Sequence, residues 1–484
     1  MNTISNQRWS DAEFDAARQE VLSSWPTGAQ VNLEEAVAYH AAMPPMKNAA
    51  RRALAAKNQG ETLLCPSLGS DTVANHTALL QHMEKEGEAD ILTSYIDSFT
   101  RNGLFERAQE GLAKAQESGR PVLNGFPFAI HGVEKTRQVI NAIHRPVMMF
   151  GPSPDARLTH EIGLAGGHTG YSGGPLISFW NYTKDVPVAQ LLRNFQYVNR
   201  LMGRYEEMGV PILYAVSGAM PSISPPSLMI APEIIEVLIA AAQGVKHIQL
   251  NNWLQGHLIQ DLAGIRVFRK LAREYLDAAG HTDVQTVTYS VSPTGRFPTS
   301  QEQVYALISY FTMIGSMGNV QICGSRTIDE AHHIPTPEGS AKSFRNARMF
   351  LSMMGPQGAS APEGATLETE CAMVEKEVRA ILDAVLELGK GDIAQGTVLA
   401  VESGILDQPY STSQQVAGRV LGVKDATGAA RFYDFGNLPL DEEIKAFHRE
   451  KIAEREALLG HKTGYDTIVA DLTAIADGAI LPVA

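Results

Sequence analysis

The feature that most constrains the fold is a repeated alternation of short apolar runs with segments of helical spacing. The apolar runs include ETLLCPS from residue 61 and KHIQLNN from residue 246, and PEIIEVLIAAAQG is typical of the segments between them. Strands that alternate with helices, without hairpin turn signals, form a parallel sheet. Eight such strands fit a closed barrel better than an open, doubly wound sheet. The sequence therefore predicts the α/β class and a (β/α)8 fold, the TIM barrel.

The predicted strands are short, and their number depends on how one glycine-rich stretch is read. The eight apolar runs begin at residues 61, 89, 120, 145, 211, 246, 284 and 319. The stretch EIGLAGGHTGYSGGPLISFWN, around residues 162–182, is compatible with a further strand or with a long glycine-rich loop over the barrel mouth. Such a loop could also present backbone N–H groups to an anion. No GxGxxG motif follows the first strand, which argues against a dinucleotide-binding fold.

The pattern divides the chain into three parts. Residues 1–58 are predicted to form a helical N-terminal arm, residues 59–358 the barrel, and residues 359–484 a C-terminal attachment. In the attachment, the segment LETECAMVEKEVRAILDAVLELGKG has the spacing of one long helix, and a short strand pair is expected around RFYDFGN.

Charge and composition exclude several classes of partner. The formal net charge is −13, with 53 acidic and 40 basic residues, which argues against nucleic acid as a partner. No apolar run approaches the 18 or so residues of a membrane span, and the N-terminus lacks an apolar signal core. Three cysteines lie far apart in the sequence, as expected of reduced thiols. We expect a cytoplasmic protein without a membrane partner.

A cluster of chemically capable residues follows the last predicted strand, in GSRTIDEAHHIPTPEGS (324–340). Catalytic groups of TIM barrels lie at this end of the strands. The adjacent His332 and His333 would point apart, so a metal site is not predicted. Arg326 and Glu330 are four residues apart and share a face if the segment is helical. They could form a surface ion pair, or together grip the hydroxyl groups of a sugar.

Several longer stretches resemble one known family. They are EVLSSWPTG, VLNGFP, PDARL, GNVQICGSRTIDEAHHIPTPE, LETE, ELGKGDIAQGTV and RFYDFGNLPLDEEIK, in the same order and without gaps. On these stretches the chain resembles the large catalytic (epsilon) subunit of glutamate mutase, also called methylaspartate mutase, over nearly its whole length. The resemblance implies a (β/α)8 barrel, adenosylcobalamin as cofactor and radical chemistry at the barrel mouth. It also implies a separate small subunit that carries the cobalamin-binding D-x-H-x-x-G motif, which this chain lacks, and a dimer of large subunits within a heterotetramer.

The resemblance carries most of the family's cofactor contacts onto this chain. The implied cofactor-binding residues are Gly69, Asn124, Asn181, Phe297, Arg326, Glu330 and Ile334. Two of them depart from the family pattern, because Arg326 replaces a lysine and Asn181 replaces a proline. Arg326 keeps the charge but changes its geometry. On this reading, the segment 324–340 is a clasp for the adenosyl ribose.

The substrate contacts are largely rewritten. The implied substrate-binding positions are Ser67, Arg101, Phe150, Gly151, Ser172, Ser178 and Tyr182. The family holds a dicarboxylate with three arginines, of which Arg101 remains while Ser67 and Phe150 replace the others. Ser172 replaces the glutamate expected to bind the substrate ammonium group, Ser178 a tyrosine and Gly151 a histidine, and Tyr182 keeps its tyrosine.

These replacements favour a substrate with fewer charges than glutamate. Burying an unpaired carboxylate beside Phe150 would cost on the order of several kcal/mol, because no hydrogen bond or opposite charge would compensate it. We therefore expect the catalytic subunit of an adenosylcobalamin-dependent carbon-skeleton mutase that acts on a small carboxylic acid other than free glutamate. Three alternatives remain open. They are a true glutamate mutase with replacement arginines such as Arg145 or Arg296, a non-catalytic cobalamin-binding homologue, and a cobalamin-free barrel lyase.

Overall fold

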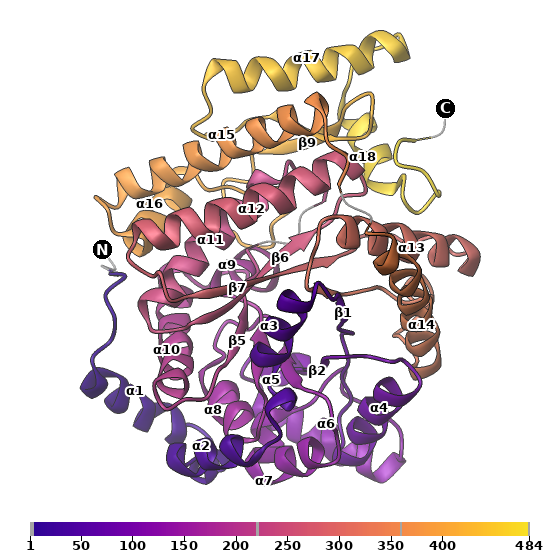
Figure 1. Cartoon of the computed structure of the whole chain (residues 1–484). Coiled ribbons are helices and arrows are strands. Elements are labelled where there is room, and N and C mark those ends of the chain that lie inside the picture. Colours follow the sequence, from indigo (N-terminus) through magenta and orange to yellow (C-terminus); the bar gives the residue numbers. More distant parts are fainter. Residues whose placement is uncertain (1–3, 219–221, 359–360, 483–484) are drawn as a thin grey trace.

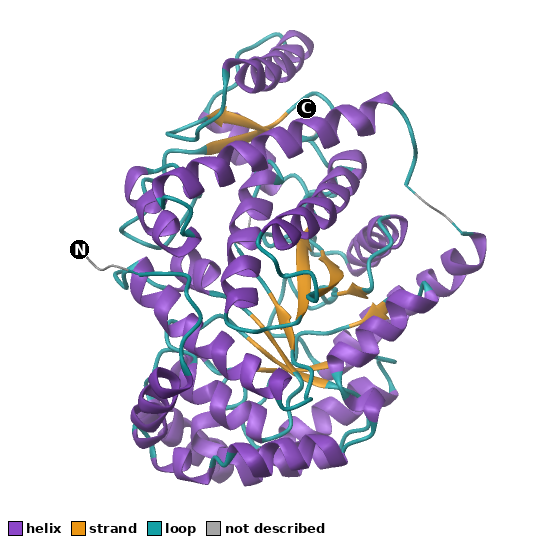
Figure 2. Ribbon diagram, turned by 60° about the vertical axis from the view of Figure 1, so that its left-hand side comes forward, coloured by secondary structure: helices purple, strands orange, loops and turns teal. Residues whose placement is uncertain are grey.

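A computed structural model, which describes residues 4–218, 222–358 and 361–482, has parallel strands at its centre with helices around them (Figures 1 and 2). The strands are β1 (Leu63–Leu64), β2 (Leu92–Tyr95), β3 (Val147–Phe150), β4 (Gly170–Ser172), β5 (Leu213–Ala215), β6 (His247–Trp253), β7 (Gln285–Val291) and β8 (Ile322–Cys323). Their order in the sheet is β1-β8-β7-β6-β5-β4-β3-β2, and every neighbouring pair is parallel.

The two ends of this strand order meet and close the sheet. The backbone N–H groups of Asp90 and Ile91, just before β2, donate to the carbonyl oxygen of Leu64 in β1 at 3.0 and 3.2 Å. Further along, the N–H of Tyr95 donates to the carbonyl oxygen of Leu68 at 2.6 Å. These bonds join the first and second strands, so the predicted (β/α)8 barrel is confirmed.

One of the eight predicted strands is wrong, and the glycine-rich stretch supplies the missing one. The run at 120–127 contributes a single bridge, between Phe126 and Ile96, and no strand. β4 lies instead in the glycine-rich stretch, where a Cβ on Gly170 would come within 2.7 Å of the carbonyl oxygen of Leu213 in β5. Glycine permits this close approach, and its weak strand propensity hides the strand from a pattern search.

Helices connect the strands and cover the outside of the barrel (Figure 2). They are α4 (Val73–Lys85), α5 (Ser98–Arg101), α6 (Phe105–Ser118), α7 (Phe128–Asn141), α8 (Arg157–Ala165), α9 (Pro175–Ile177), α10 (Val188–Glu207), α11 (Ser227–Ala242), α12 (Leu258–Ala278), α13 (Gln301–Met317) and α14 (Pro337–Met354), with a π-helical turn η3 (Ser178–Tyr182) and a 3-10 turn η4 (Gly355–Gln357). α11 is buried along nearly its whole length because helices of the attachment cover its outer side.

The N-terminal segment closes one end of the barrel. It contains α1 (Asp11–Ser23), η1 (Pro26–Gln30), α2 (Leu33–Ala42), η2 (Pro45–Lys47) and α3 (Ala49–Gln59). The side chains of Ala49, Ala50, Ala53 and Ala56 on α3 are fully buried, in one cluster with apolar side chains of the strands. Small side chains let α3 sit directly against the strands, as its position in Figure 1 shows.

The C-terminal segment packs on α11 and α12 (Figure 1). It contains α15 (Ala365–Leu388), α16 (Ile393–Ser403), an antiparallel pair of β9 (Leu421–Lys424) and β10 (Ala430–Asp434), α17 (Glu442–Leu459) and α18 (Tyr465–Thr473). The expected long helix and strand pair are therefore confirmed. The boundary expected at residue 359 lies outside the described residues. Buried Arg431 ties the strand pair to the long helix, since it bonds both Glu370 on α15 and Asp425 after β9.

Within residues 4–218, 222–358 and 361–482, no helix is both long enough and apolar enough to span a bilayer.

The seating of α3 gives a stability prediction. Replacing Ala53 with leucine adds three carbons where no space is free, so it should lower the free energy of unfolding by about 1–3 kcal/mol. Urea unfolding followed by circular dichroism measures this change. The matched control is Ala278→Leu, on an exposed alanine in the last turn of α12, which should shift the midpoint little. An unchanged midpoint for Ala53→Leu would show that α3 does not press on the strands.

Candidate active site at the barrel mouth

A cavity of about 380 Å³ lies at the carboxyl ends of the strands. It is within the range of about 300–1,000 Å³ that is common for small-molecule sites. Eight of the residues predicted from the sequence line it: Ser67, Gly69, Asn124, Phe150, Tyr182, Arg326, Glu330 and Ile334. These residues come from segments that are far apart in the sequence, so the barrel brings most of the predicted site together.

The cavity narrows into a small, uncharged extension inside the barrel. Ser67, Phe150 and Ser172 converge there, together with Gln249 of β6 and Tyr289 of β7. The extension measures about 10 Å³, which is close to the space that one water molecule needs. Its other lining residues are Cys65, Pro66, Thr93 and Met148. Burial raises the pKa of the Cys65 thiol to about 12, so the thiol is neutral as well. The three positions where the family's charged substrate contacts are lost therefore share one neutral space.

The segment after β8 forms a preshaped clasp at the rim of the cavity. Nη1 of Arg326 donates to Oε1 of Glu330 at 3.2 Å, and the two side chains are 26% and 25% exposed. The neighbouring Asp329 is buried, and its Oδ2 accepts bonds of 2.7 Å from both the N–H and the hydroxyl of Thr336. Because Thr336 also caps α14, the clasp is anchored to a helix that flanks the barrel.

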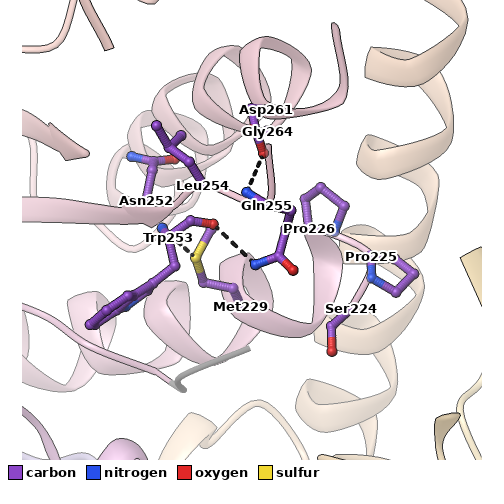
Figure 3. Close-up of a pocket in the computed structure, with 10 residues that line it drawn as sticks. All are labelled: Ser224, Pro225, Pro226, Met229, Asn252, Trp253, Leu254, Gln255, Asp261 and Gly264. Atoms are coloured by element: carbon purple, nitrogen blue, oxygen red, sulfur yellow. Dashed lines mark hydrogen bonds between the residues drawn. The ribbon is translucent and has the colours of Figure 1, made fainter. Parts of the chain in front are cut away.

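Two residues that line the cavity carry buried N–H groups without a partner among the described residues. They are Nε of Arg326 and the indole N–H of Trp253. Figure 3 shows the backbone of Trp253 held by Met229 and Gln255, while its indole ring points away from Ser224. Buried donors in native proteins are almost always satisfied, and an absent ligand or water explains such exceptions.

Arg101, the arginine that the resemblance assigns to the substrate site, is not among the residues that line the cavity. Its guanidinium carbon lies 4.8 Å from the centroid of the Tyr182 ring, and its Nη1 donates to the Tyr95 hydroxyl at 3.4 Å. Arg101 thus stands behind two tyrosines that do line the cavity. Burial raises the pKa of Tyr182 above its ordinary range, so this phenol is protonated and can donate a hydrogen bond.

The remaining predicted residues lie around the cavity rather than in its wall. Phe297 and Arg296 line a neighbouring cavity of about 220 Å³, next to Lys424 of the attachment. Gly151 has φ of 128° and lies beside the Tyr95 ring. Ser178 is fully buried and donates to the carbonyl oxygen of Gly174 at 2.7 Å, and Asn181 is in the same turn, η3, as Tyr182.

Arg145, one of the two replacement arginines considered from the sequence, lies at the wrong end of the barrel. It stands before the first residue of β3, Val147, whereas the cavity lies after the last, Phe150. Arg145 therefore cannot reach a ligand in the cavity.

The glycine-rich stretch is buried structure and neither a mobile loop nor an open anion cradle. Its backbone N–H groups bond to the protein itself, as in the bond from Gly173 to the carbonyl oxygen of Ala215 in β5. The carboxylate of Glu236 on α11 accepts bonds from the N–H groups of Leu176 at 2.8 Å and Ser217 at 3.1 Å. A Cβ on Gly174 would come within 2.2 Å of that carboxylate, so glycine is needed there.

A buried carboxylate also positions the segment that carries Asn124. Asp71 is fully buried, and its Oδ2 accepts from the N–H groups of Val122 and Leu123 at 2.5 and 3.2 Å. The amide oxygen of Asn124 then accepts from the N–H of Ser98 at 2.9 Å, which leaves its NH2 group for a ligand. These contacts also explain why the run at 120–127 forms no strand, since a side chain takes up its backbone donors.

Sequence reasoning missed three aromatic residues that strands contribute to the cavity wall: Tyr95, Trp253 and Tyr289. Each lies at or near the carboxyl end of a strand, and that position was the available signal. His332 bonds the carbonyl oxygen of Thr299, and the described residues contain no group of three or more His, Cys, Asp or Glu side chains able to hold a metal ion.

A closed parallel barrel with a cavity at the carboxyl ends of its strands defines the molecule as a protein of the (β/α)8 class. Comparison with known proteins then narrows the class. The family model of the methylaspartate mutase E chain matches residues 43–482. The chain is 39% identical to the glutamate mutase epsilon subunit of Desulfitobacterium hafniense, over 99% of both chains. It is 35% identical to the subunit of the same name from Escherichia coli over 99% of both chains, and 34% identical to that of Treponema denticola over 98% of both. The chain belongs to the methylaspartate mutase E chain family, a family of mutase subunits.

The Asp71 anchor gives a second prediction. All the groups that Asp71 bonds are donors, so the NH2 of an asparagine cannot replace a carboxylate oxygen. Asp71→Asn should cost about 1.5–3 kcal/mol of stability, the loss of a hydrogen bond to a charged group. Amide hydrogen exchange at Val122 and Leu123 should become faster. Asp185→Asn, at an exposed aspartate, is the control. Unchanged exchange at Val122 would mean that Asp71 does not hold this segment.

Proposed function

We propose that this chain is the catalytic subunit of an adenosylcobalamin-dependent carbon-skeleton mutase that acts on a small carboxylic acid other than free glutamate. It works with a separate small subunit that carries the D-x-H-x-x-G motif, in a heterotetramer with two large subunits. The observation that carries the proposal is one cavity with two unlike parts. The clasp residues Arg326 and Glu330 stand at its rim, and an uncharged extension with Ser67, Phe150 and Ser172 lies below.

The residues of the rim fit the adenosyl group of the cofactor. The Glu330 carboxylate can accept from ribose hydroxyls, and the Asn124 amide can donate to ribose or base acceptors. Gly69 gives a flat wall, since a Cβ at this position would come within 2.8 Å of Tyr95 and 2.9 Å of Gly125. Ile334, 77% exposed, offers an apolar contact to whatever covers the mouth.

When bound, adenosylcobalamin supplies the radical chemistry by which a group moves between neighbouring carbon atoms. The chain's own residues orient the substrate and exclude water. Burial raises the pKa of Tyr182, so its phenol offers no base, and Phe150 keeps one side of the cavity apolar. A closed, dry cavity protects reactive species from side reactions. No side chain is required to act as a nucleophile.

The uncharged extension supports a substrate other than free glutamate. A second carboxylate or an ammonium group placed there would meet serine, phenylalanine and glutamine side chains and no opposite charge. Burying such a charge without a partner costs on the order of several kcal/mol. A neutral or apolar group loses nothing in this position.

Substrate turnover tests this proposal. The chain is combined with the small cobalamin-binding subunit of a relative and adenosylcobalamin, and products are followed by NMR with L-glutamate, 3-methylaspartate and small monocarboxylic acids. We expect isomerisation of a monocarboxylic acid and at least a hundredfold lower kcat/KM for glutamate, since each unpaired buried charge costs about 1–3 kcal/mol or more. Efficient turnover of glutamate would instead identify a true glutamate mutase, as the relatives' names suggest.

Cofactor binding gives a third prediction. Because the chain lacks the cobalamin-binding motif, adenosylcobalamin should bind tightly only when the small subunit is present. Glu330→Gln should weaken that binding about tenfold or more, since a hydrogen bond to a charged group contributes about 1.5–3 kcal/mol. Titration followed by cobalamin absorbance measures both effects. Glu368→Gln, at an exposed position on α15, is the matched control. Stoichiometric tight binding to the isolated chain would contradict the division of labour between subunits.

A further inference from the structure

The substrate's carboxylate needs a cation, and the described residues that line the cavity offer Arg326 rather than Arg101. Arg326 stands in the wall and pairs with Glu330 through Nη1 at 3.2 Å. A guanidinium has five N–H donors in a fixed fork that matches a carboxylate. The pair with Glu330 therefore leaves donors over for a second acceptor.

Tyr289 is the second group at this place. It lines both the main cavity and its uncharged extension, so it stands where the two join. Burial raises the pKa of Tyr289 far above its ordinary range and the nearby Arg326 guanidinium opposes that shift, so the hydroxyl is a neutral donor beside a fixed positive charge. A Cβ on Gly324 would come within 2.0 Å of the Tyr289 hydroxyl oxygen, which explains the glycine at the start of the clasp.

Arg101 is held by other contacts. Its guanidinium lies over the Tyr182 ring and bonds the Tyr95 hydroxyl, and both tyrosines line the cavity while Arg101 does not. A cation over an aromatic face is attracted to the ring. These contacts hold Arg101 against Tyr95 and Tyr182, whereas Arg326 lines the cavity itself.

We propose that Arg326 and Tyr289 together bind the carboxylate of the substrate, whose uncharged end points into the extension formed by Ser67, Phe150 and Ser172. This inference rests on the proposed function for its substrate and adds the orientation, the recognition residues and the limit of one carboxylate. The exchange of lysine for arginine at position 326 then has a chemical reason. The Arg326 guanidinium can donate hydrogen bonds to Glu330 and to a substrate carboxylate at the same time. Its positive charge then compensates for the arginines that Ser67 and Phe150 replace.

Direct binding tests the proposal without turnover. The probes are butyrate, its neutral isostere butyramide, and glutarate, which is butyrate with a second carboxylate at the far end. Calorimetric titrations are run on the full chain alone and on the chain with the small subunit and adenosylcobalamin. Butyrate should saturate in at least one of the two forms, and butyramide and glutarate should bind at least tenfold more weakly.

The variants separate the two arginines. Arg326→Gln should weaken butyrate binding about tenfold to a hundredfold, the loss expected for a charge-assisted bond, and Tyr289→Phe about twofold to tenfold. Arg326→Lys should recover part of the loss, because it restores the positive charge in the wall. Arg101→Gln should weaken binding less than Arg326→Gln does. Arg51→Gln, at an exposed arginine on the α3 side of the barrel, is the matched control.

Three results would overturn the proposal: a larger loss for Arg101→Gln than for Arg326→Gln, glutarate binding as tight as butyrate, or no saturation by butyrate in either form. Cobalamin absorbance is recorded in the same samples. Butyrate binding without cobalamin binding would reject the proposed function and keep the carboxylate site. Cobalamin binding without butyrate binding would reject the carboxylate site and keep the proposed use of cobalamin.

Discussion

Buried carboxylates that accept hydrogen bonds from loop backbones hold the mouth of this barrel together. Asp71 fixes the segment of Asn124, Glu236 joins the ends of β4 and β5, and Asp329 fixes the clasp. Asp261 does the same for the loop after β6, where it accepts from the N–H groups of Gln255 and Gly256 (Figure 3). Loop N–H groups that point into a protein must find acceptors, and a carboxylate can serve several of them. The cavity wall is therefore set by the fold before any ligand arrives.

This arrangement separates what the sequence could predict from what it could not. The barrel follows from the alternation of apolar runs and helical segments, and the long helix and strand pair of the attachment follow from equally local patterns. The sequence gives no clear signal for β4 because glycine at position 170 has a weak strand propensity, although its close approach to β5 requires that glycine. The run at 120–127 has the apolar pattern of a strand, but Asp71, 51 residues before Val122, takes up its backbone N–H groups. Long-range contacts of this kind leave no trace in a local pattern.

The candidate site shows the same division. The resemblance to a family gave the positions of Ser67, Phe150 and Arg326, and the fold brings them to one cavity. It could not show that Arg101 stacks on Tyr182 behind the wall, or that Tyr289 stands beside Arg326, because these are relations between side chains of different strands. The residue type at an aligned position determines which functional groups are present. The packing around that residue determines which of these groups a ligand can contact.

The position of helix α3 limits how a small-molecule ligand can enter and leave the barrel. Its row of alanines, which includes Ala49, Ala50 and Ala53, stops the end of the barrel opposite the cavity. Within the described residues, the barrel is therefore open only at its mouth. A partner that covers the mouth would also cover this route into the barrel. A ligand that lies deep in the lumen has to arrive before the cover and leave after it. Ligand binding must then precede the covering of the mouth, and ligand release must follow its uncovering. The lifetime of the covered state sets how long the ligand stays bound.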